Sequence, residues 1–367
     1  MRPAHPVATH VLNLRVGDAV RVRSEQEILA TLDDGGSLDG LPFMPEMLRY
    51  CGKSFTVFKR VDKACDTIVR DGIRRMKNTV LLDDLRCDGG AHAGCQAACT
   101  ILWKEAWLKR APKHAATESS TTETAEQSHA NPLGLCTIES LLRATRTSTP
   151  AESSSEEVRF FCQATEMRKA TAPMAWWSPA QYWRDVRSGN VGVRPLIRAF
   201  FVWLFNVAQR YRRGAQYPFI EGRLAKTPQV DLGLQPGESV RLKSKREILE
   251  TLDTRNRNRG LSFDRELVKF CGGTYPVRAR VDKVISETTG KMLRLSNPCV
   301  ILEGVTCMGD YNRYCPRNIF HFVREAWLEK VPGVACSGAP SGAASGASSS
   351  APSTPSGKNS AAALSAQ

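Results

Sequence analysis

The 367-residue chain lacks the short motifs that mark the common hydrolases, nucleotide-binding enzymes and metalloproteases. It contains no GxSxG nucleophile elbow, no Gly-rich phosphate-binding loop with its lysine and no HExxH helix. Its six histidines follow no mutual pattern, so acid–base catalysis by histidine is not favoured. The CxxC pairs of the common zinc ribbons are also absent. Binding and structural roles, together with less common metal sites, are the functions that remain to be considered.

The first residues carry no sustained apolar run and no small-residue cleavage site, so we expect no secretory signal and a cytoplasmic location. In a reducing compartment, recurrent cysteine spacing favours metal binding or reactivity over structural disulfides. The apolar stretch Leu196–Phe205 is too short, and too interrupted by Arg198, to cross a bilayer, which takes about 20 apolar residues. We therefore expect no transmembrane span.

The charge balance is strongly basic. The chain has 51 Lys and Arg residues against 37 Asp and Glu residues, a net charge of +14, and an isoelectric point near 9.4. Such a balance favours an anionic partner, which can be nucleic acid, a phospholipid surface or an acidic protein. The arginines are scattered, so free use of arginine without a partner stays open as the alternative.

The chain contains two copies of one domain. The segment Gly17–Pro112 aligns without a gap on Gly237–Pro332, at a constant offset of 220 residues, and about a third of the aligned positions are identical. GDAVRVRSEQEILATLD matches GESVRLKSKREILETLD, and KEAWLKRAP matches REAWLEKVP. Common descent within one chain is the economical explanation.

Each copy is predicted to consist of short strands with minor helices. Residues 18–24, 54–63 and 78–85 have the composition of strands, as do their counterparts in the second copy. Ser24, followed by Glu27, predicts a capping box at the start of a short helix. The closing segments, residues 101–108 and 321–328, follow a helical period that places Trp107 and Trp327 on an apolar face. This pattern favours a small β-barrel over a parallel βαβ sheet.

The order of a strand, a short helix, the segment GLPFMPEMLRYCGKSFTVFKRV, a hairpin and a final strand resembles SH3-like barrels. The tandem arrangement is similar to that of an uncharacterised bacterial tandem-repeat family whose SH3-like domains carry recurrent cysteines. The resemblance implies an α+β chain, mainly β with minor helices, in which two SH3-like barrels are joined by a linker and a short helical segment. It implies a fold and no reaction, because small barrels host many unrelated activities.

Three pairs of cysteines coincide at the 220-residue offset, and a metal ion explains their retention better than ancestry alone. In the first copy, one Gly-rich loop carries several of these ligands and is expected to run into a helix, so that Cys95 and Cys99 share a helical face. Cys51 is either a further ligand or a small buried residue, and Cys162 is an additional option. The predicted metal ligands are Cys51, Cys87, His92, Cys95 and Cys99 in the first copy and Cys271, Cys307, Cys315 and His321 in the second.

Zinc is the expected ion, and iron is the alternative. The opposing interpretation is that the cysteines pack as small hydrophobic residues in the core. Four protein ligands would close the site and make it structural, whereas three would leave a coordination position for water or substrate.

The regions outside the copies differ in composition. We expect a repeat at residues 14–112, a disordered linker at 113–156, a helical Trp-rich connector at 157–232, a second repeat at 233–332 and a disordered tail at 333–367. Ser178, Pro179 and Gly189 predict a short helix with Ser178 as its N-cap. A second helix follows, and its Leu196–Phe205 segment is either packed in a core or dimer contact, or lies on a membrane surface.

Three functions follow as hypotheses. The first is a metal-stabilised tandem binding or scaffold protein. The second is a metalloenzyme with an open, thiolate-ligated zinc or iron site in a biosynthetic pathway. The third is a basic protein that binds nucleic acid.

Overall fold

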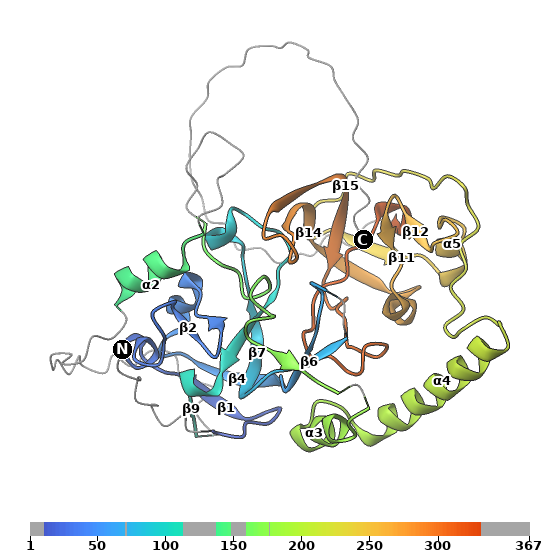
Figure 1. Cartoon of the computed structure of the whole chain (residues 1–367). Coiled ribbons are helices and arrows are strands. Elements are labelled where there is room, and N and C mark those ends of the chain that lie inside the picture. Colours follow the sequence, from blue (N-terminus) through green and yellow to red (C-terminus); the bar gives the residue numbers. More distant parts are fainter. Residues whose placement is uncertain (1–10, 70–71, 113–136, 148–158, 176, 332–367) are drawn as a thin grey trace, which may run out of the picture. The chain divides into compact units, whose positions relative to one another are not determined.

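A computed structural model of the chain describes residues 11–69, 72–112, 137–147, 159–175 and 177–331, and it is mainly β (Figure 1). Its contacts divide the chain into two compact units. The first takes in the described residues up to Phe219 together with Val281–Pro298 and Gly304–His321. The second takes in Ile220–Arg280, Cys299–Glu303 and the described residues from Phe322. Two segments of the second copy therefore belong to the unit that contains the first copy.

The first copy is built on a five-stranded sheet in the order β8, β7, β4, β1, β9, and every pairing in it is antiparallel (Figure 1). Its strands are β1 (Ala19–Val22), β4 (Ser54–Arg60), β7 (Thr79–Arg86), β8 (Thr100–Lys104) and β9 (Leu108–Arg110). A smaller sheet has the order β10 (Ala172–Pro173), β6 (Ile73–Arg75), β5 (Lys63–Cys65). A short hairpin joins β2 (Ser37–Leu38) to β3 (Leu41–Pro42).

The second copy has a four-stranded sheet in the order β15, β14, β11, β16. Its strands are β11 (Ser239–Leu242), β14 (Thr274–Ile285), β15 (Met292–Leu302) and β16 (Leu328–Lys330), and a separate hairpin joins β12 (Arg257–Asn258) to β13 (Leu261–Ser262). Ala19 pairs with Thr56 in the first copy, and Ser239 pairs with Pro276 in the second, so the register is repeated at the 220-residue offset.

The helices are short, with one exception. The α-helices are α1 (Glu25–Leu29), α2 (Ile138–Thr145), α3 (Ala180–Ser188), α4 (Val193–Tyr211) and α5 (Lys245–Leu249). The 3-10 helices are η1 (Pro45–Tyr50), η2 (Gly90–His92), η3 (Glu105–Trp107), η4 (Arg265–Phe270) and η5 (Glu325–Trp327). In α1, Ser24 and Glu27 form the expected capping box, which confirms that helix start.

Each copy places a tryptophan at the centre of its core. Trp107 is fully buried, and its indole Nε1 donates a hydrogen bond to Thr31 Oγ1 at 3.0 Å. Its ring meets the ring of Phe43 edge to face, with centroids 5.2 Å apart. Trp327 and Thr251 repeat the hydrogen bond at 3.0 Å. A buried indole N–H needs such a partner, so the threonine is retained with the tryptophan.

The prediction of a helix at the end of each copy is wrong. Residues 100–104 form strand β8, Trp107 ends the 3-10 helix η3, and strand β9 follows. The run Ile101, Leu102 and Trp103 is at most 4% exposed, so this strand is buried on both faces. A short run that is apolar on both faces has no strand period, and periodicity cannot distinguish it from a helix.

The prediction of a helix that carries Cys95 and Cys99 is also wrong, because residues 95–99 have no regular secondary structure. Ala93 and Ala98 have φ angles of 52° and 47°, which interrupt any helical run. The Gln96 N–H donates to the carbonyl of Lys283 at 3.1 Å and not to a preceding turn.

The connector contains the expected helices. The first is α3, although its N-cap is Pro179 and not Ser178, and Gly189 ends it with a φ of 81°. Helix α2 lies within the stretch 113–156 that we expected to be a linker. Residues 113–136 and 148–156 of that stretch, like the tail at 333–367, lie outside the described residues.

Helix α4 leaves its apolar side chains in solvent. Phe201 is 62% and Trp203 is 54% exposed, and Asn206 is the buried residue of this helix. The expectation that α4 packs in the core of its own chain is therefore wrong. None of the helices that the structure describes could span a lipid bilayer.

Candidate metal centre and a basic cleft

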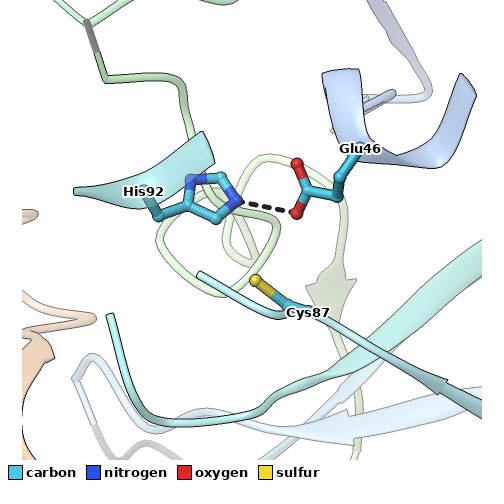
Figure 2. A group of neighbouring side chains, drawn as sticks. All are labelled: Glu46, Cys87 and His92. Carbon is cyan, nitrogen blue, oxygen red and sulfur yellow. Dashed lines mark hydrogen bonds and ion pairs between the residues drawn. The ribbon is translucent and has the colours of Figure 1, made fainter. Parts of the chain in front are cut away.

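Three side chains that can bind a metal converge in the first unit (Figure 2). Glu46 lies in the first turn of η1, Cys87 follows directly after β7, and His92 ends η2. One ligand atom from each lies within 4.8 Å of the others. Figure 2 shows the thiol of Cys87 facing the space beside the imidazole and the carboxylate. This triad, Glu46–Cys87–His92, is the candidate metal centre.

The triad is buried, and a backbone carbonyl fixes the orientation of its histidine. His92 is fully buried, the side chain of Glu46 is 6% exposed, and Cys87 is 8% exposed. His92 Nδ1 lies 3.1 Å from the carbonyl oxygen of Phe160, so Nδ1 carries the proton of that hydrogen bond. Nε2 faces Glu46 Oε1 at 3.0 Å. A backbone carbonyl behind one ring nitrogen is the usual support for a histidine whose other nitrogen binds a metal.

The polar atoms of the triad fit a cation. Glu46 Oε2 is buried and accepts no hydrogen bond from the described residues, although such an atom normally has a partner. Burial raises the pKa of Glu46, but the hydrogen bond and charge of His92 outweigh it, so the pKa of this carboxyl is lowered. Burial raises the pKa of the Cys87 thiol, and the charge of Glu46 adds to the increase. Metal binding at this centre must therefore release the thiol proton.

Gly89 sets the shape of the loop that carries His92. Its φ is 78°, and a Cβ at this position would lie 2.0 Å from the carbonyl oxygen of Cys95. The Gly89 carbonyl accepts hydrogen bonds from the N–H groups of His92 and Gly94, both at 2.9 Å. The tight loop brings His92 back towards the end of β7, and only glycine allows it.

The other predicted ligands of the first copy lie outside the triad. Cys51 caps η1 and is half-buried. Cys95 Sγ accepts a hydrogen bond from the Ile285 N–H at 3.3 Å. Cys99 and Cys162 line a cavity that also borders Cys87. The structure thus brings two of the five predicted ligands, Cys87 and His92, together.

The predicted ligands of the second copy are divided in the same way. Ligand atoms of Cys307 and His321 come within 4.8 Å of one another. Cys271 belongs to the second unit, where its thiol donates to the Leu267 carbonyl at 3.5 Å. Cys315 lies beside Cys65.

Glu46 is the ligand that the sequence interpretation missed. Cysteines and histidines guided the search, and a carboxylate 41 residues from Cys87 in the sequence was not considered. A signal was present, since Glu46 recurs as Glu266 at the 220-residue offset, together with Cys87 and Cys307. Retention of this glutamate in both copies could have directed attention to it.

The cavity beside the triad is small. It has a volume of about 20 Å³ and is lined by residues that include Met44, Cys87, Cys99 and Cys162. One water molecule needs roughly 10–15 Å³ on this measure, so the cavity admits a water and no organic substrate.

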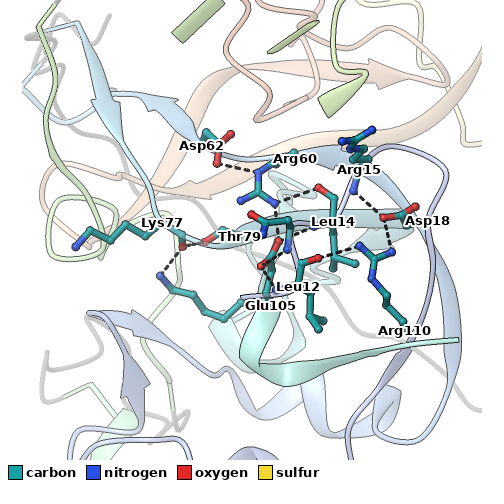
Figure 3. Close-up of polar contacts among 12 residues, drawn as sticks. Leu12, Leu14, Arg15, Asp18, Arg60, Asp62, Lys77, Thr79, Glu105 and Arg110 are labelled. Atoms are coloured by element: carbon teal, nitrogen blue, oxygen red, sulfur yellow. Dashed lines mark hydrogen bonds and ion pairs between the residues drawn. The ribbon is translucent and has the colours of Figure 1, made fainter. Parts of the chain in front are cut away.

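A separate cleft of about 470 Å³ in the first unit is rich in positive charge. Arg60, one of the lining residues, is held between Asp62 and Glu105 (Figure 3). Within the described part of the chain, the other basic side chains of the cleft make no ion pair. They are Arg15, Arg75, Lys77, Arg184 and Arg187. Asp62 is the one acidic residue in the lining, so the cleft suits an anion.

No family model, no curated protein sequence and no solved structure matches this chain. Functional conclusions therefore depend on the residues and geometry described above.

Proposed function

We propose that this chain is a metal-binding protein in which Glu46, Cys87 and His92 hold a zinc ion that stabilises the first repeat as a binding or scaffold module. The proposal is carried by the convergence of three buried ligand atoms within 4.8 Å, one of them a carboxylate oxygen without a hydrogen-bond partner among the described residues. Cysteine, histidine and carboxylate are all zinc ligands, and a mixed set of this kind also accepts iron.

A structural ion is favoured over a catalytic one. Three protein ligands leave a fourth position, which a catalytic zinc would offer to substrate. The triad is buried, and the bordering cavity has a volume of about 20 Å³, which is enough for water alone. An ion here would join η1, the end of β7 and η2, three segments that regular strand pairing does not connect. The metalloenzyme hypothesis is the weaker alternative for this reason.

The proposed fold of each module is an SH3-like barrel. Five short antiparallel strands with a 3-10 helix before the last one support this assignment for the first copy. The repeated register between β11, β14 and β16 supports it for the second.

Metal analysis of the full chain, purified without a histidine tag, tests the proposed function. Elemental analysis should find zinc, and Cys87→Ser and Glu46→Gln should each lose one equivalent relative to the natural chain. Cys51→Ser is the matched control, because this thiol lies outside the triad, and it should retain the metal. Equal metal content in all four proteins would contradict the proposal, and iron in place of zinc would change the identity of the ion.

A second candidate function is binding of nucleic acid, which the basic cleft favours. Arginine side chains suit phosphate oxygens, and five basic groups of the cleft make no ion pair within the described part of the chain. Binding of a single-stranded oligonucleotide should weaken steeply with salt, because each neutralised phosphate releases a counterion. Arg184→Gln with Arg187→Gln should lower the salt slope by about 1 to 2, whereas Arg246→Gln, on the exposed face of α5, should not change it. Failure to bind at low salt would reject this candidate.

A further inference from the structure

Two thiols from different copies meet in a small apolar cluster of the first unit. Cys65 ends β5 and is 9% exposed, and Cys315, from the second copy, is 1% exposed. The Cys65 N–H donates a hydrogen bond to Cys315 Sγ at 3.1 Å. Ile73 and Met174 complete the cluster. The Cys315 sulfur therefore lies against the backbone of Cys65, within the same buried cluster.

This contact is one half of a reciprocal arrangement between the copies. At the 220-residue offset, Cys315 is the counterpart of Cys95, and Cys65 is the counterpart of Ile285. The Ile285 N–H donates to Cys95 Sγ at 3.3 Å, as the Cys65 N–H donates to Cys315. Each copy thus presents its loop cysteine to a strand of the other copy. Only the first of these two contacts brings two thiols together, because Cys65 faces Cys315, whereas Cys95 faces an isoleucine.

The reciprocal contact explains why Cys95 and Cys315 are both retained although neither lies in the metal triad. Their loops share one conformation, in which the cysteine N–H donates to the carbonyl three residues earlier, at 3.2 Å in the first copy and 3.0 Å in the second. Each sulfur then accepts a hydrogen bond from a backbone N–H of the strand that it faces.

A positive charge lies against Cys65. Arg317 is 5% exposed, its Nη1 lies 4.0 Å from Cys65 Sγ, and its Nη2 lies 2.9 Å from Glu287 Oε1. The hydrogen bond from Cys315 and the charge of Arg317 outweigh burial and lower the pKa of Cys65 to about 6. The same hydrogen bond, together with burial, raises the pKa of Cys315. Cys65 therefore forms a thiolate more readily than Cys315, which suits Cys65 as the first nucleophile and Cys315 as the thiol that reacts second.

We propose that Cys65 and Cys315 form a reversible disulfide with a small disulfide, RSSR, as the oxidant. The Cys65 thiolate attacks one sulfur of RSSR, which forms a mixed disulfide and releases RS⁻. The Cys315 sulfur, as it loses its proton, then attacks Cys65 Sγ, forms the bond between the two cysteines and releases the second RS⁻. Two thiols lose two electrons, RSSR gains them, and the two thiol protons leave with two molecules of RSH. The bond joins the first copy to a loop of the second.

The test is peptide mapping of the full chain after treatment with glutathione disulfide, without reduction. The expected product is a crosslinked pair of peptides that contains Cys65 and Cys315, and dithiothreitol should separate it. Cys95→Ser is the matched control, because it removes the equivalent loop thiol and should leave the crosslink unchanged. Cys65→Ser should abolish it.

Arg317→Gln examines the proposed activation of Cys65. It should slow the first step roughly tenfold, since loss of the positive charge lowers the thiolate fraction. Recovery of Cys65 and Cys315 as free thiols in the treated natural chain, or a crosslink through Cys95 instead, would overturn the proposal. Stable glutathione on Cys65 without transfer to Cys315 would overturn it as well. None of these outcomes depends on the metal triad, so this proposal and the proposed function can fail separately.

Discussion

Arg60 Nη1 lies 2.5 Å from Glu105 Oε1, and this buried ion pair fixes the start of the described chain to the first sheet. Glu105 is 1% exposed and also accepts the backbone N–H groups of Leu12 and Leu14, at 2.8 and 2.9 Å (Figure 3). Arg60 Nη1 donates in addition to the Leu14 carbonyl at 3.0 Å. Together with the Asn13 N–H at 3.1 Å, the carboxylate thus accepts hydrogen bonds from three successive backbone N–H groups and from the Arg60 guanidinium.

Glu105→Gln is expected to destabilise the first unit by about 2–3 kcal/mol, because it removes one of the two counter-charges of the largely buried Arg60 guanidinium and leaves Asp62 as the other. Chemical denaturation, monitored by fluorescence of the buried tryptophans, measures this free energy of unfolding. Asp18→Asn is a suitable comparison, since its ion pair with Arg110 is half exposed and should contribute less than about 1 kcal/mol. Equal losses of unfolding free energy in the two variants would show that the Arg60–Glu105 pair contributes no more to stability than an exposed ion pair.

Gly89→Ala should disrupt the loop that carries His92. The added Cβ would lie 2.0 Å from the Cys95 carbonyl oxygen, so the backbone must move as well as bear a left-handed conformation. Gly52→Ala separates the two effects, because Gly52 has a similar φ of 75° but open space around its Cβ position. We expect about 1 kcal/mol of destabilisation for Gly52→Ala, and a larger loss with reduced zinc content for Gly89→Ala. Full zinc content in Gly89→Ala would contradict this role.

The reactivity of Cys65 should reach its plateau at a lower pH than that of an ordinary thiol. Cys315 and Arg317 lower the pKa of Cys65 to about 6 against the opposing effects of burial and of Glu287, so its thiolate is nearly fully formed by pH 8. Burial raises the pKa of Cys51 above its usual value, so the reactivity of Cys51 should still be rising there. Iodoacetamide labelling at a series of pH values, quantified for each peptide, measures both curves. A Cys65 curve that rises in parallel with that of Cys51 would exclude the lowered pKa.

Helix α4 is expected to bind anionic membranes. Its exposed aromatic residues lie among arginines, and residues 193–213 contain five arginines and no acidic residue. Phe201→Ser with Trp203→Ser should lower sedimentation with phosphatidylserine vesicles roughly tenfold, whereas Trp183→Ser, on α3, should not. Binding should also weaken with salt. Dimerisation that is lost in the same α4 variant, without vesicle binding, would assign this face to a second copy instead.

Much of the fold could be predicted from the sequence, because duplication and local signals both act over short distances. The capping box at Ser24 and the helix that ends at Gly189 depend on neighbouring residues alone, and both are confirmed. The segment around Trp103 was misassigned because burial on both faces erases the period that separates strand from helix. Its conformation is decided by pairing with β7, which is a tertiary contact.

The candidate site was predicted in part for a similar reason. Cys87 and His92 are five residues apart, so a local pattern could group them, whereas Glu46 reaches them through the fold. Conserved spacing also grouped Cys95 with them, although its sulfur faces Ile285 of the other copy. The repeat shows that a cysteine is present in both copies, but only the folded structure shows which contact that cysteine makes.

X-ray absorption spectroscopy at the zinc edge of the purified full chain tests the metal centre most directly. With Cys87, His92 and Glu46 as ligands, the spectrum should contain a single sulfur at about 2.3 Å and nitrogen or oxygen atoms at about 2.0–2.2 Å, and the sulfur contribution should disappear in Cys87→Ser. A shell of three or four sulfurs, or a spectrum that Cys87→Ser leaves unchanged, would contradict the assignment.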